Sequence, residues 1–192
     1  MRLGHTGPMH SATKPLPDRP RRVLVAGVSG VGKTTMARRL AAAWALPYTE
    51  IDALFHGPQW VPRESFDDDV AALVATPAWV TEWQYATARP VLAAHADLLV
   101  WLDLPFRVTL ARVIRRTVKR ARTGETLWNG NVEPGLWHAF TASEGIVVWA
   151  VRTRGKYRRE VPLLEAQHPS LVVVRLRTQR EADDWFDRVA AS

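Results

Sequence analysis

Residues 27–34, Gly27-Val28-Ser29-Gly30-Val31-Gly32-Lys33-Thr34, decide the fold predicted for this chain. The stretch fits G-x-x-x-x-G-K-[ST], the phosphate-binding P-loop. Its glycines permit backbone angles that other residues avoid, so that successive N–H groups can turn toward phosphate oxygens. Lys33 can reach the β- and γ-phosphates of a nucleoside triphosphate, and the Thr34 hydroxyl can ligate Mg²⁺. The stretch therefore predicts a site for ATP and Mg²⁺.

The residues on either side of the P-loop predict a strand and a helix. Residues 22–26 form a short apolar, β-branched run, as expected of a buried parallel strand. Residues 35–44 predict a helix that ends near Pro47, and its positive N-terminal end points at the same anion. The alternative is a glycine-rich turn that binds nothing. Strand, loop, Lys-Thr pair and helix together favour the nucleotide site.

Length and composition indicate one soluble domain. A chain of 192 residues suffices for one well-buried α/β domain. It has no cysteine, which excludes disulfides, thiolate metal sites and a cysteine nucleophile. It has no apolar run of the ~20 residues that span a membrane and no apolar core of a secretory signal, so we expect a cytoplasmic protein. Its oligomeric state is open at this stage.

The sequence divides into a tail and a domain. Residues 1–20 are rich in Pro, Gly, Ser and His and show no apolar periodicity, which predicts a disordered N-terminal tail. Residues 21–192 are predicted to form a single P-loop domain.

Five predicted strands alternate with helices. The strands are expected at residues 22–26, 48–51, 79–81, 97–102 and 171–176. The helices after the first are expected at residues 64–75, 89–95, 106–122 and 136–157, and from a capping box at residues 178–181. This alternation predicts an α/β fold with a five-stranded parallel sheet and helices on both faces. Ligands of such sheets bind at the carboxyl ends of the strands, where the P-loop also lies.

Carboxylates end three of the predicted strands. Asp52, Glu82 and Asp103 occupy these positions and can reach the P-loop edge. A kinase site needs a carboxylate to orient the metal and its waters, and one to accept a proton from the acceptor. The alternative is that these residues begin loops or cap helices, and Asp103 directly precedes a helix that begins at Pro105. Asp52 and Glu82 are therefore the candidates, with Asp52 also a candidate metal ligand.

Two basic runs flank a polar segment, residues 123–135, which we expect to be a mobile lid. The basic residues are Arg107, Arg112, Arg115, Arg116, Lys119, Arg120 and Arg122 on one side, and Arg152, Arg154, Lys156, Arg158 and Arg159 on the other. They contribute to a formal net charge of +7 that favours phosphate-bearing partners. Guanidinium groups here can neutralise charge on a transferring phosphoryl group. A solvated helix face and a nucleic-acid backbone site are the alternatives.

Aromatic side chains follow the second and third predicted strands. They are Phe55, Trp60, Trp83 and Tyr85, in the region where an acceptor would enter. They either stack on a planar ligand or fill the core, and the sequence leaves both open. His56 has no second histidine at metal-ligand spacing, so we predict no zinc site.

With these motifs the chain resembles the FlaR-like "topology modulation" proteins, small P-loop proteins related to adenylate, shikimate and gluconate kinases. The resemblance covers residues 20–190 and is carried by the P-loop and by the segments at residues 46–47, 52–55, 60–63, 79–80, 101–105 and 173–177. It implies a nucleoside-monophosphate-kinase-like core. By similarity, Asp52 lies between Mg²⁺ and the acceptor, Arg112 packs on the adenine, Arg116 meets phosphates, and Arg177 lies near the base.

One segment departs from this family. Its members carry Asp-Gly-Asn-Tyr after the third strand, whereas this chain has Glu82-Trp83-Gln84-Tyr85. Glutamate keeps the carboxylate on a side chain one methylene longer. Tryptophan in place of glycine fills space where an acceptor approaches, so the family's acceptor specificity does not carry over to this chain.

The leading interpretation is an ATP-dependent kinase acting on a small-molecule acceptor. Its predicted catalytic residues are Lys33, Asp52, Glu82 and Arg116. The predicted nucleotide contacts are Gly27, Ser29, Gly30, Val31, Gly32, Lys33, Thr34, Thr35, Arg112 and Arg177, with Thr34 and Asp52 at the metal. The alternative is a nucleic-acid-binding P-loop protein with regulatory ATP hydrolysis, although no helix-turn-helix or aromatic-basic RNA motif supports it. The sequence leaves the acceptor open among nucleotides, sugar acids, amino acids and other hydroxyl compounds.

Overall fold

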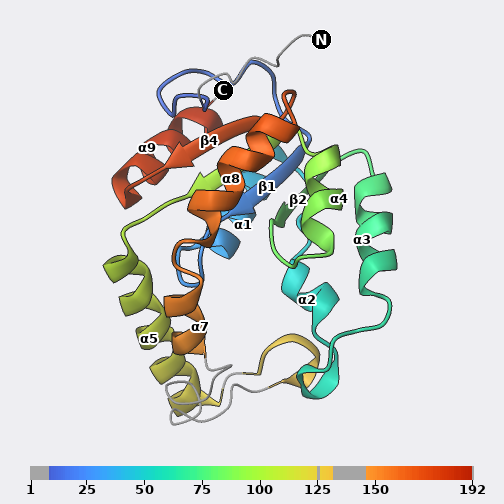
Figure 1. Cartoon of the computed structure of the whole chain (residues 1–192), viewed down its shortest axis with the longest axis vertical. Helices are drawn as coiled ribbons and strands as arrows, with labels where there is room; N and C mark the ends of the chain where they lie inside the picture. Colours follow the sequence, from blue (N-terminus) through green and yellow to red (C-terminus); the bar gives the residue numbers. More distant parts are fainter. Residues whose placement is uncertain (1–8, 125, 132–145, 192) are drawn as a thin grey trace.

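A computed structural model describes residues 9–124, 126–131 and 146–191 of the chain (Figure 1). Their sheet has four parallel strands in the order β2-β1-β3-β4. The strands are β1 (Arg22–Ala26), β2 (Trp79–Glu82), β3 (Leu98–Leu102) and β4 (Val172–Leu176). They are rich in valine and leucine, and β3 is buried along its whole length, as expected of a parallel sheet covered on both faces. The predicted parallel α/β class is confirmed.

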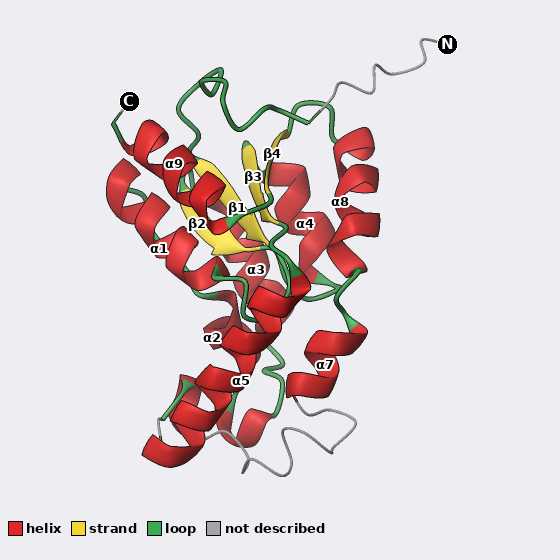
Figure 2. Cartoon of the chain, turned by 90° about the vertical axis from the view of Figure 1, so that its left-hand side faces the viewer, coloured by secondary structure: helices red, strands yellow, loops and turns green. Residues whose placement is uncertain are grey.

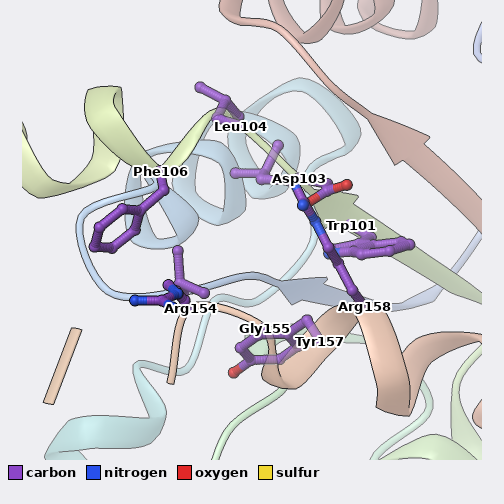
Figure 3. Close-up of a pocket in the computed structure, with 10 residues that line it drawn as sticks. Trp101, Asp103, Leu104, Phe106, Arg154, Gly155, Tyr157 and Arg158 are labelled. Atoms are coloured by element: carbon purple, nitrogen blue, oxygen red, sulfur yellow. The ribbon is translucent and has the colours of Figure 1, made fainter. Parts of the chain in front are cut away.

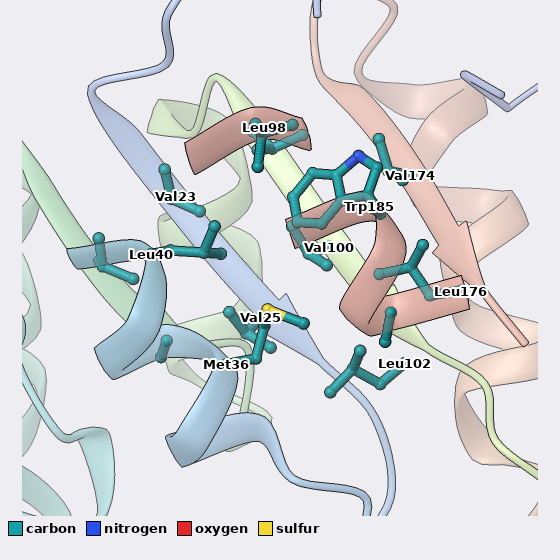
Figure 4. Packing of buried hydrophobic residues seen from close by; sticks show 14 of the residues in the cluster. Val23, Val25, Met36, Leu40, Leu98, Val100, Leu102, Val174, Leu176 and Trp185 are labelled. Carbon is teal, nitrogen blue, oxygen red and sulfur yellow. The ribbon is translucent and has the colours of Figure 1, made fainter. Parts of the chain in front are cut away.

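Helices cover both faces of the sheet (Figure 2). One face carries α1 (Lys33–Trp44) and α9 (Gln179–Ala190), and the other carries α3 (Phe66–Ala75), α4 (Ala88–His95) and α8 (Lys156–Gln167). On the first face, Leu40 of α1 and Trp185 of α9 pack against Val23, Val25 and Val100 (Figure 4). Alternate residues of β1 point to opposite faces, so Leu24 joins the second core instead.

Two groups of elements lie beyond the carboxyl ends of the strands. On one side, α5 (Phe106–Thr123) packs against α7 (Ile146–Arg152). On the other side lie α2 (Ile51–Phe55) and the short 3₁₀ helix η1 (Pro58–Trp60), which contacts a second 3₁₀ helix, η2 (Trp128–Gly130). Figure 1 shows the P-loop end of β1 pointing into the region between these two groups. No helix in the described part of the chain is long and apolar enough to cross a membrane.

The second predicted strand, at residues 48–51, is reduced to one parallel bridge between Tyr48 and Val80. The backbone pairing stops there because the N–H of Ile51 donates to the side chain of Glu82, at 3.2 Å from Oε2, instead of to a strand. Helix α2 begins at Ile51. The described sheet therefore has four strands rather than the five we predicted, and Asp52 lies in the first turn of a helix.

The helix predicted at residues 136–157 differs in extent from the observed elements. Residues 136–145 lie outside the described part, α7 ends at Arg152, and α8 begins at Lys156 after a turn that includes Gly155. Helix α8 was not predicted, and it contains Pro162 although proline normally interrupts a helix. The predicted lid, residues 123–135, is described only in part, since positions 125 and 132–135 lie outside the described residues. Its described part contains the 3₁₀ helix η2.

The described part of the predicted tail, residues 9–20, packs on the domain. The N–H of His10 donates to the carbonyl of Val173 at 2.9 Å, and Arg188 donates to the carbonyl of Ala12 at 2.8 Å. Ala12 is buried. The prediction of disorder is therefore wrong for these residues, because backbone pairing along β4 does not require the apolar periodicity that we sought. Residues 1–8 lie outside the described part.

Candidate active site

The P-loop joins the end of β1 to α1 and is held against α5. Gly30 has a φ of +76°, and a Cβ at this position would lie 2.6 Å from the carbonyl oxygen of Thr109 and 2.6 Å from Cγ2 of Val113. Gly27 is similarly confined, since a Cβ there would lie 2.8 Å from the carbonyl oxygen of Leu102. Both positions therefore require glycine for backbone angle and for space.

Helix α1 presents its N-terminal end without a side-chain cap. Gly32 is the residue that precedes the helix, and it has no side chain that could cap the first turn. The first N–H groups of a helix have no partner within the helix, and they carry a partial positive charge. In this twelve-residue helix they are available to an anion, as the P-loop motif predicts.

Lys33 is buried beside the P-loop. Its side chain curls back so that Nζ donates to the carbonyl oxygen of Val28 at 3.3 Å. Burial lowers the pKa of Lys33 from 10.5 to about 8, while the carboxylates of Asp52 and then Glu82 oppose this decrease. The ammonium group is thus poorly solvated and close to carboxylates on the far side of the P-loop. A phosphate bound in the loop would place negative charge beside this ammonium group and so compensate for the loss of water around it.

Glu82, at the end of β2, is 1% exposed. Its Oε1 accepts from the Tyr48 hydroxyl at 2.7 Å, and its Oε2 accepts from the N–H of Ile51 at 3.2 Å. Burial raises the pKa of Glu82, and the hydrogen bonds from Tyr48, Ile51 and Thr34 act in the opposite direction. Glu82 therefore joins β2 to the start of α2 and lies beside Thr34, the predicted metal ligand.

Asp52 lies in the first turn of α2 and accepts two hydrogen bonds from the segment after β2. The Tyr85 hydroxyl donates to Oδ1 at 2.6 Å, and Nε2 of Gln84 donates to the same oxygen at 3.2 Å. Tyr85 takes the left-handed conformation, with φ of +57°, which is unusual for a residue that is not glycine. We did not predict these partners, although both lie within three residues after Glu82 in the sequence.

Asp103 does not join the site. Its two oxygens pair with arginines from distant segments: Arg158 Nε donates to Oδ1 at 2.9 Å, and Arg175 Nε donates to Oδ2 at 3.0 Å. Asp103 thereby links β3 to α8 and β4. Asp103 does lie at the strand-end edge, where it lines a cavity together with Val28 of the P-loop, but two guanidinium groups occupy its two oxygens.

Trp83 fills the core rather than an acceptor site. It is 4% exposed, its Nε1 donates to the carbonyl of Arg89 at 3.0 Å, and its own carbonyl accepts from the Tyr157 hydroxyl at 3.2 Å. The backbone turns after Glu82 so that this ring points between α4 and α8. Of the two alternatives that the sequence left open for Trp83, the structure shows the filling of the core.

The other aromatic residues form a wall beside Asp52. The rings of Phe55 and Tyr85 stack with centroids 3.9 Å apart. His56 stacks on Trp128 of η2 at 5.7 Å and meets the edge of Trp60 at 5.0 Å. The sequence indicated this cluster only in part, since Trp128 lies in the segment predicted as a lid.

A cavity of about 350 Å³ lies beside the P-loop on the α9 side. Its lining residues are Val31, Gly32, Thr35, Met36, Arg39, Leu102, Leu104, Arg112, Gln179 and Ala182. Arg112 closes one side, where Nη1 donates to the carbonyl of Val31 at 3.3 Å and Nη2 donates to Oε1 of Gln179 at 2.8 Å. The structure thus brings Arg112, Val31, Gly32 and Thr35 together around one cavity, and their predicted contacts with a nucleotide stay a prediction.

The two other predicted arginines, Arg177 and Arg116, lie in different surroundings. Arg177 does not line this cavity; its backbone N–H donates to Glu181 at 2.7 Å as part of the helix cap, and Gln179 takes its predicted place. Sequence reasoning missed Gln179, because we assigned it only to the cap. Arg116, one turn after Arg112, lies close enough to Lys33 for its charge to lower the pKa of that lysine. The predicted contact of Arg116 with phosphates stays a prediction.

A second cavity, of about 360 Å³, opens between the P-loop and the junction of α7 and α8. It is lined by Val28, Trp101, Leu102, Asp103, Leu104, Phe106, Arg154, Gly155, Tyr157 and Arg158. Figure 3 shows Arg158 extending beside Asp103 and Trp101, with Phe106 and Arg154 across the opening. Arg154, from the second predicted basic run, therefore faces the same strand ends as the P-loop.

The donor groups fit a magnesium ion held jointly with a nucleotide. Mg²⁺ prefers oxygen ligands and usually keeps several waters while it binds one or two protein groups and the phosphates. The Thr34 hydroxyl follows Lys33 directly, and Glu82 lies beside it. These residues would hold the metal and its waters.

Comparison with known proteins supports the fold. No family model and no curated protein sequence matches this chain. Among solved structures, a shikimate kinase from Acinetobacter baumannii in complex with shikimate is similar with a TM-score of 0.54 and 18% identity, over 88% of this chain and 90% of that one. A gluconokinase from Sinorhizobium meliloti 1021 is similar with a TM-score of 0.50 and 21% identity, over 90% and 94%. A shikimate kinase from Bacteroides thetaiotaomicron gives a TM-score of 0.53 and 12% identity, over 90% and 98%.

These similarities identify the fold as that of P-loop small-molecule kinases, and the chain spans nearly the whole length of the proteins it matches. The predicted similarity to shikimate and gluconate kinases is confirmed for the fold. The finer resemblance to FlaR-like proteins stays a prediction.

Proposed function

We propose that this protein is an ATP-dependent kinase that transfers the γ-phosphoryl group to a hydroxyl group of a small molecule. One observation carries the proposal. The Asp52 carboxylate, fixed by Tyr85 and Gln84, lies within electrostatic reach of the buried P-loop lysine, Lys33. A phosphate donor site and a potential proton acceptor therefore face one another.

The donor half of the proposed site is built on the P-loop. The triphosphate lies against the N-terminal end of α1 and its backbone N–H groups, with Lys33 at the β- and γ-phosphates. Thr34, with Glu82 ordering the metal's waters, would hold Mg²⁺, which would supply charge neutralisation for the phosphates. The adenine enters the cavity lined by Arg112 and Gln179, where the Arg112 guanidinium offers a planar surface for stacking.

The acceptor half of the proposed site centres on Asp52. The acceptor hydroxyl donates its proton to the Asp52 carboxylate while its oxygen forms a bond to the γ-phosphorus. The bond between that phosphorus and the β,γ-bridging oxygen breaks, and ADP leaves with the electron pair. Arg116, whose charge acts on Lys33 in this structure, neutralises charge on the transferred group. Positioning and charge stabilisation provide most of the rate.

The similar structures favour a small acceptor. One of them is a shikimate kinase solved with shikimate, and another is a gluconokinase. In the proposed site, the aromatic wall that includes Phe55, Tyr85 and Trp60 would border such a molecule beside Asp52. We propose transfer to such a molecule rather than to a nucleic acid.

The experiment is a screen of ADP release from MgATP across a panel of sugar acids, cyclic and linear hydroxy acids, hydroxy amino acids and nucleotides, with mass detection of the phosphorylated product. Replacement of Lys33 by alanine should abolish transfer while the protein remains folded. Lys14, an exposed lysine outside the site, provides the matched control, and Lys14→Ala should act like the wild type. Full transfer by Lys33→Ala would refute the mechanism, and MgATP that fails to bind the wild-type protein would refute the function.

A further inference from the structure

A chain of hydrogen bonds leads away from Asp52 through two aromatic side chains. The Tyr85 hydroxyl donates to Oδ1 of Asp52 at 2.6 Å, and the same hydroxyl oxygen lies 3.2 Å from Nε2 of His56. A phenol has one proton, and the carboxylate accepts it. The Tyr85 oxygen must therefore accept from His56, which requires the tautomer with the proton on Nε2.

The other ring nitrogen of His56 agrees with this tautomer. Nδ1 is buried and has no hydrogen-bond partner among the described residues. A protonated Nδ1 would leave a buried donor unsatisfied, whereas a bare acceptor lone pair costs less in these surroundings. Burial also lowers the pKa of His56, with the Asp52 charge opposing it, so the ring is neutral at pH 7.

The surrounding packing fixes both rings. The Tyr85 ring stacks on Phe55 at 3.9 Å with an angle of 19° between planes, and His56 stacks on Trp128 at 5.7 Å with an angle of 21°. Tyr85 also holds a left-handed backbone, φ of +57°, which costs on the order of 1–3 kcal/mol at a residue that is not glycine. Packing thus maintains an unfavourable backbone that brings the Tyr85 hydroxyl onto Asp52.

We propose that His56 and Tyr85 are positioning residues that orient Asp52, so that its oxygen Oδ2 receives the proton of the acceptor hydroxyl. Oδ1 already accepts from Tyr85 and Gln84, while the described residues place no donor on Oδ2. This inference rests on the proposed function, in which Asp52 accepts that proton. The His56–Tyr85 chain acts only through the orientation of the carboxylate, and neither side chain exchanges a proton with the substrate.

The first experiment determines the tautomer of His56, and so tests the hydrogen-bond chain, without any substrate. In the full-length protein labelled with ¹⁵N-histidine, two-dimensional NMR distinguishes the two neutral tautomers by their nitrogen shifts. His56, assigned by its loss in His56→Gln, should show the proton on Nε2, and Tyr85→Phe should shift that nitrogen because the acceptor oxygen is gone. A proton on Nδ1 of His56 would overturn the proposed chain.

The second experiment measures how matched substitutions of His56 and Tyr85 change the rate of phosphoryl transfer. His56→Gln can keep a donor near the position of Nε2, whereas His56→Phe keeps the aromatic stacking on Trp128 and removes the donor. The probe is MgATP with water as the acceptor, followed as ADP release, and the best acceptor from the panel is used in parallel. We expect His56→Phe and Tyr85→Phe to lower kcat about ten-fold with little change in KM for MgATP, and His56→Gln to restore most of kcat.

Controls separate this inference from the proposed function. His95→Gln changes an exposed histidine on α4 and should leave kcat unchanged, and thermal unfolding should show that every variant is folded. Equal kcat for His56→Phe, Tyr85→Phe and the wild type would overturn the positioning role while the kinase function stands. A wild-type protein that binds no MgATP would refute the proposed function, and the NMR result would still decide the hydrogen-bond chain.

Discussion

The Tyr48 hydroxyl donates a 2.7 Å hydrogen bond to Oε1 of Glu82. Tyr48 also forms a parallel bridge with Val80, so it is joined to β2 through its backbone and through its side chain. Glu82 is a carboxylate with 1% exposure, so its charge depends on the donors around it. Tyr48 and the N–H of Ile51 provide them. The same carboxylate therefore stabilises the start of α2 and faces the P-loop threonine.

Removal of the Tyr48 hydroxyl should destabilise the protein. Tyr48→Phe leaves a buried carboxylate oxygen without its donor, which costs on the order of 1–3 kcal/mol. Tyr157→Phe is the matched control, because the Tyr157 hydroxyl donates only to a neutral backbone carbonyl, that of Trp83. Urea unfolding of both variants should show the larger loss for Tyr48→Phe. Equal losses would mean that the bond to Glu82 has no special importance for stability.

The stability contributed by Glu82 should depend on pH with a defined sign. Burial raises the pKa of Glu82 above 4.5, so between 4.5 and the raised value the folded protein binds more protons than the unfolded chain. The free energy of unfolding therefore falls as pH rises through this window. Glu82→Gln cannot titrate, so its stability relative to wild type should rise with pH across the window and then level off. Urea unfolding at a series of pH values measures this difference, and a difference independent of pH would contradict the prediction.

The strongly apolar segments were predicted well because they carry a signal in their own residues. Strand β1 matches residues 22–26, and the long helix predicted at 106–122 is observed as Phe106–Thr123. Burial on both faces of a strand and amphipathic periodicity on a helix are local patterns. The P-loop likewise needs only eight consecutive residues to specify its fold.

The parts that were not predicted depend on partners from distant segments. Trp83 points into the core because Tyr157, 74 positions later, meets its backbone carbonyl. The two oxygens of Asp103 are occupied by Arg158 and Arg175, which lie 55 and 72 positions later in the chain. Sequence spacing specifies where these residues stand along the chain, and it does not specify the direction of their side chains. The acceptor half of the site is built largely from such directions.

Nucleotide binding should take up protons at alkaline pH. The pKa of Lys33 is lowered to about 8 in this structure, mainly by burial, and bound phosphates would raise it. At pH 8–9 the free protein has lost part of this proton and the complex regains it, so the affinity for MgATP should fall as pH rises above 8. Isothermal titration calorimetry in buffers of different ionisation enthalpy measures the uptake directly. The same uptake in Lys33→Met would assign it to another group.

The contact between the P-loop and α5 should be intolerant of a single methyl group. Gly30→Ala would place Cβ 2.6 Å from the Thr109 carbonyl in a backbone with φ of +76°. We expect a loss of about 3 kcal/mol, from the left-handed backbone and from overpacking. Gly124→Ala is the matched control, with φ of +60° and nothing within 4 Å of its Cβ, and should lose about 1 kcal/mol. Urea unfolding compares the two, and a Gly124→Ala loss as large as that of Gly30→Ala would argue against the close contact.

Arg112 should determine nucleotide affinity rather than the rate of transfer. Its guanidinium bridges the Val31 carbonyl of the P-loop and the Gln179 side chain of α9, and thereby forms one wall of the proposed adenine cavity. Arg112→Ala opens that wall and removes a stacking surface, so we expect MgATP to bind about ten-fold more weakly. The value of kcat should change little, because Arg112 contacts no group at Asp52 or Glu82 among the described residues. Fluorescent ATP-analogue binding together with steady-state kinetics separates the two quantities.

Arg180 provides the control for this last substitution. It is an exposed arginine that follows Gln179 directly and pairs with Asp184 on α9, so Arg180→Ala removes the same charge from the same region without touching the cavity. Its MgATP affinity should equal that of the wild type, because charge alone at that distance is screened by solvent. Equal weakening by Arg112→Ala and Arg180→Ala would mean that general positive charge, rather than the wall beside the P-loop, attracts the nucleotide. A ten-fold effect confined to Arg112 would place the adenine between this guanidinium and α9.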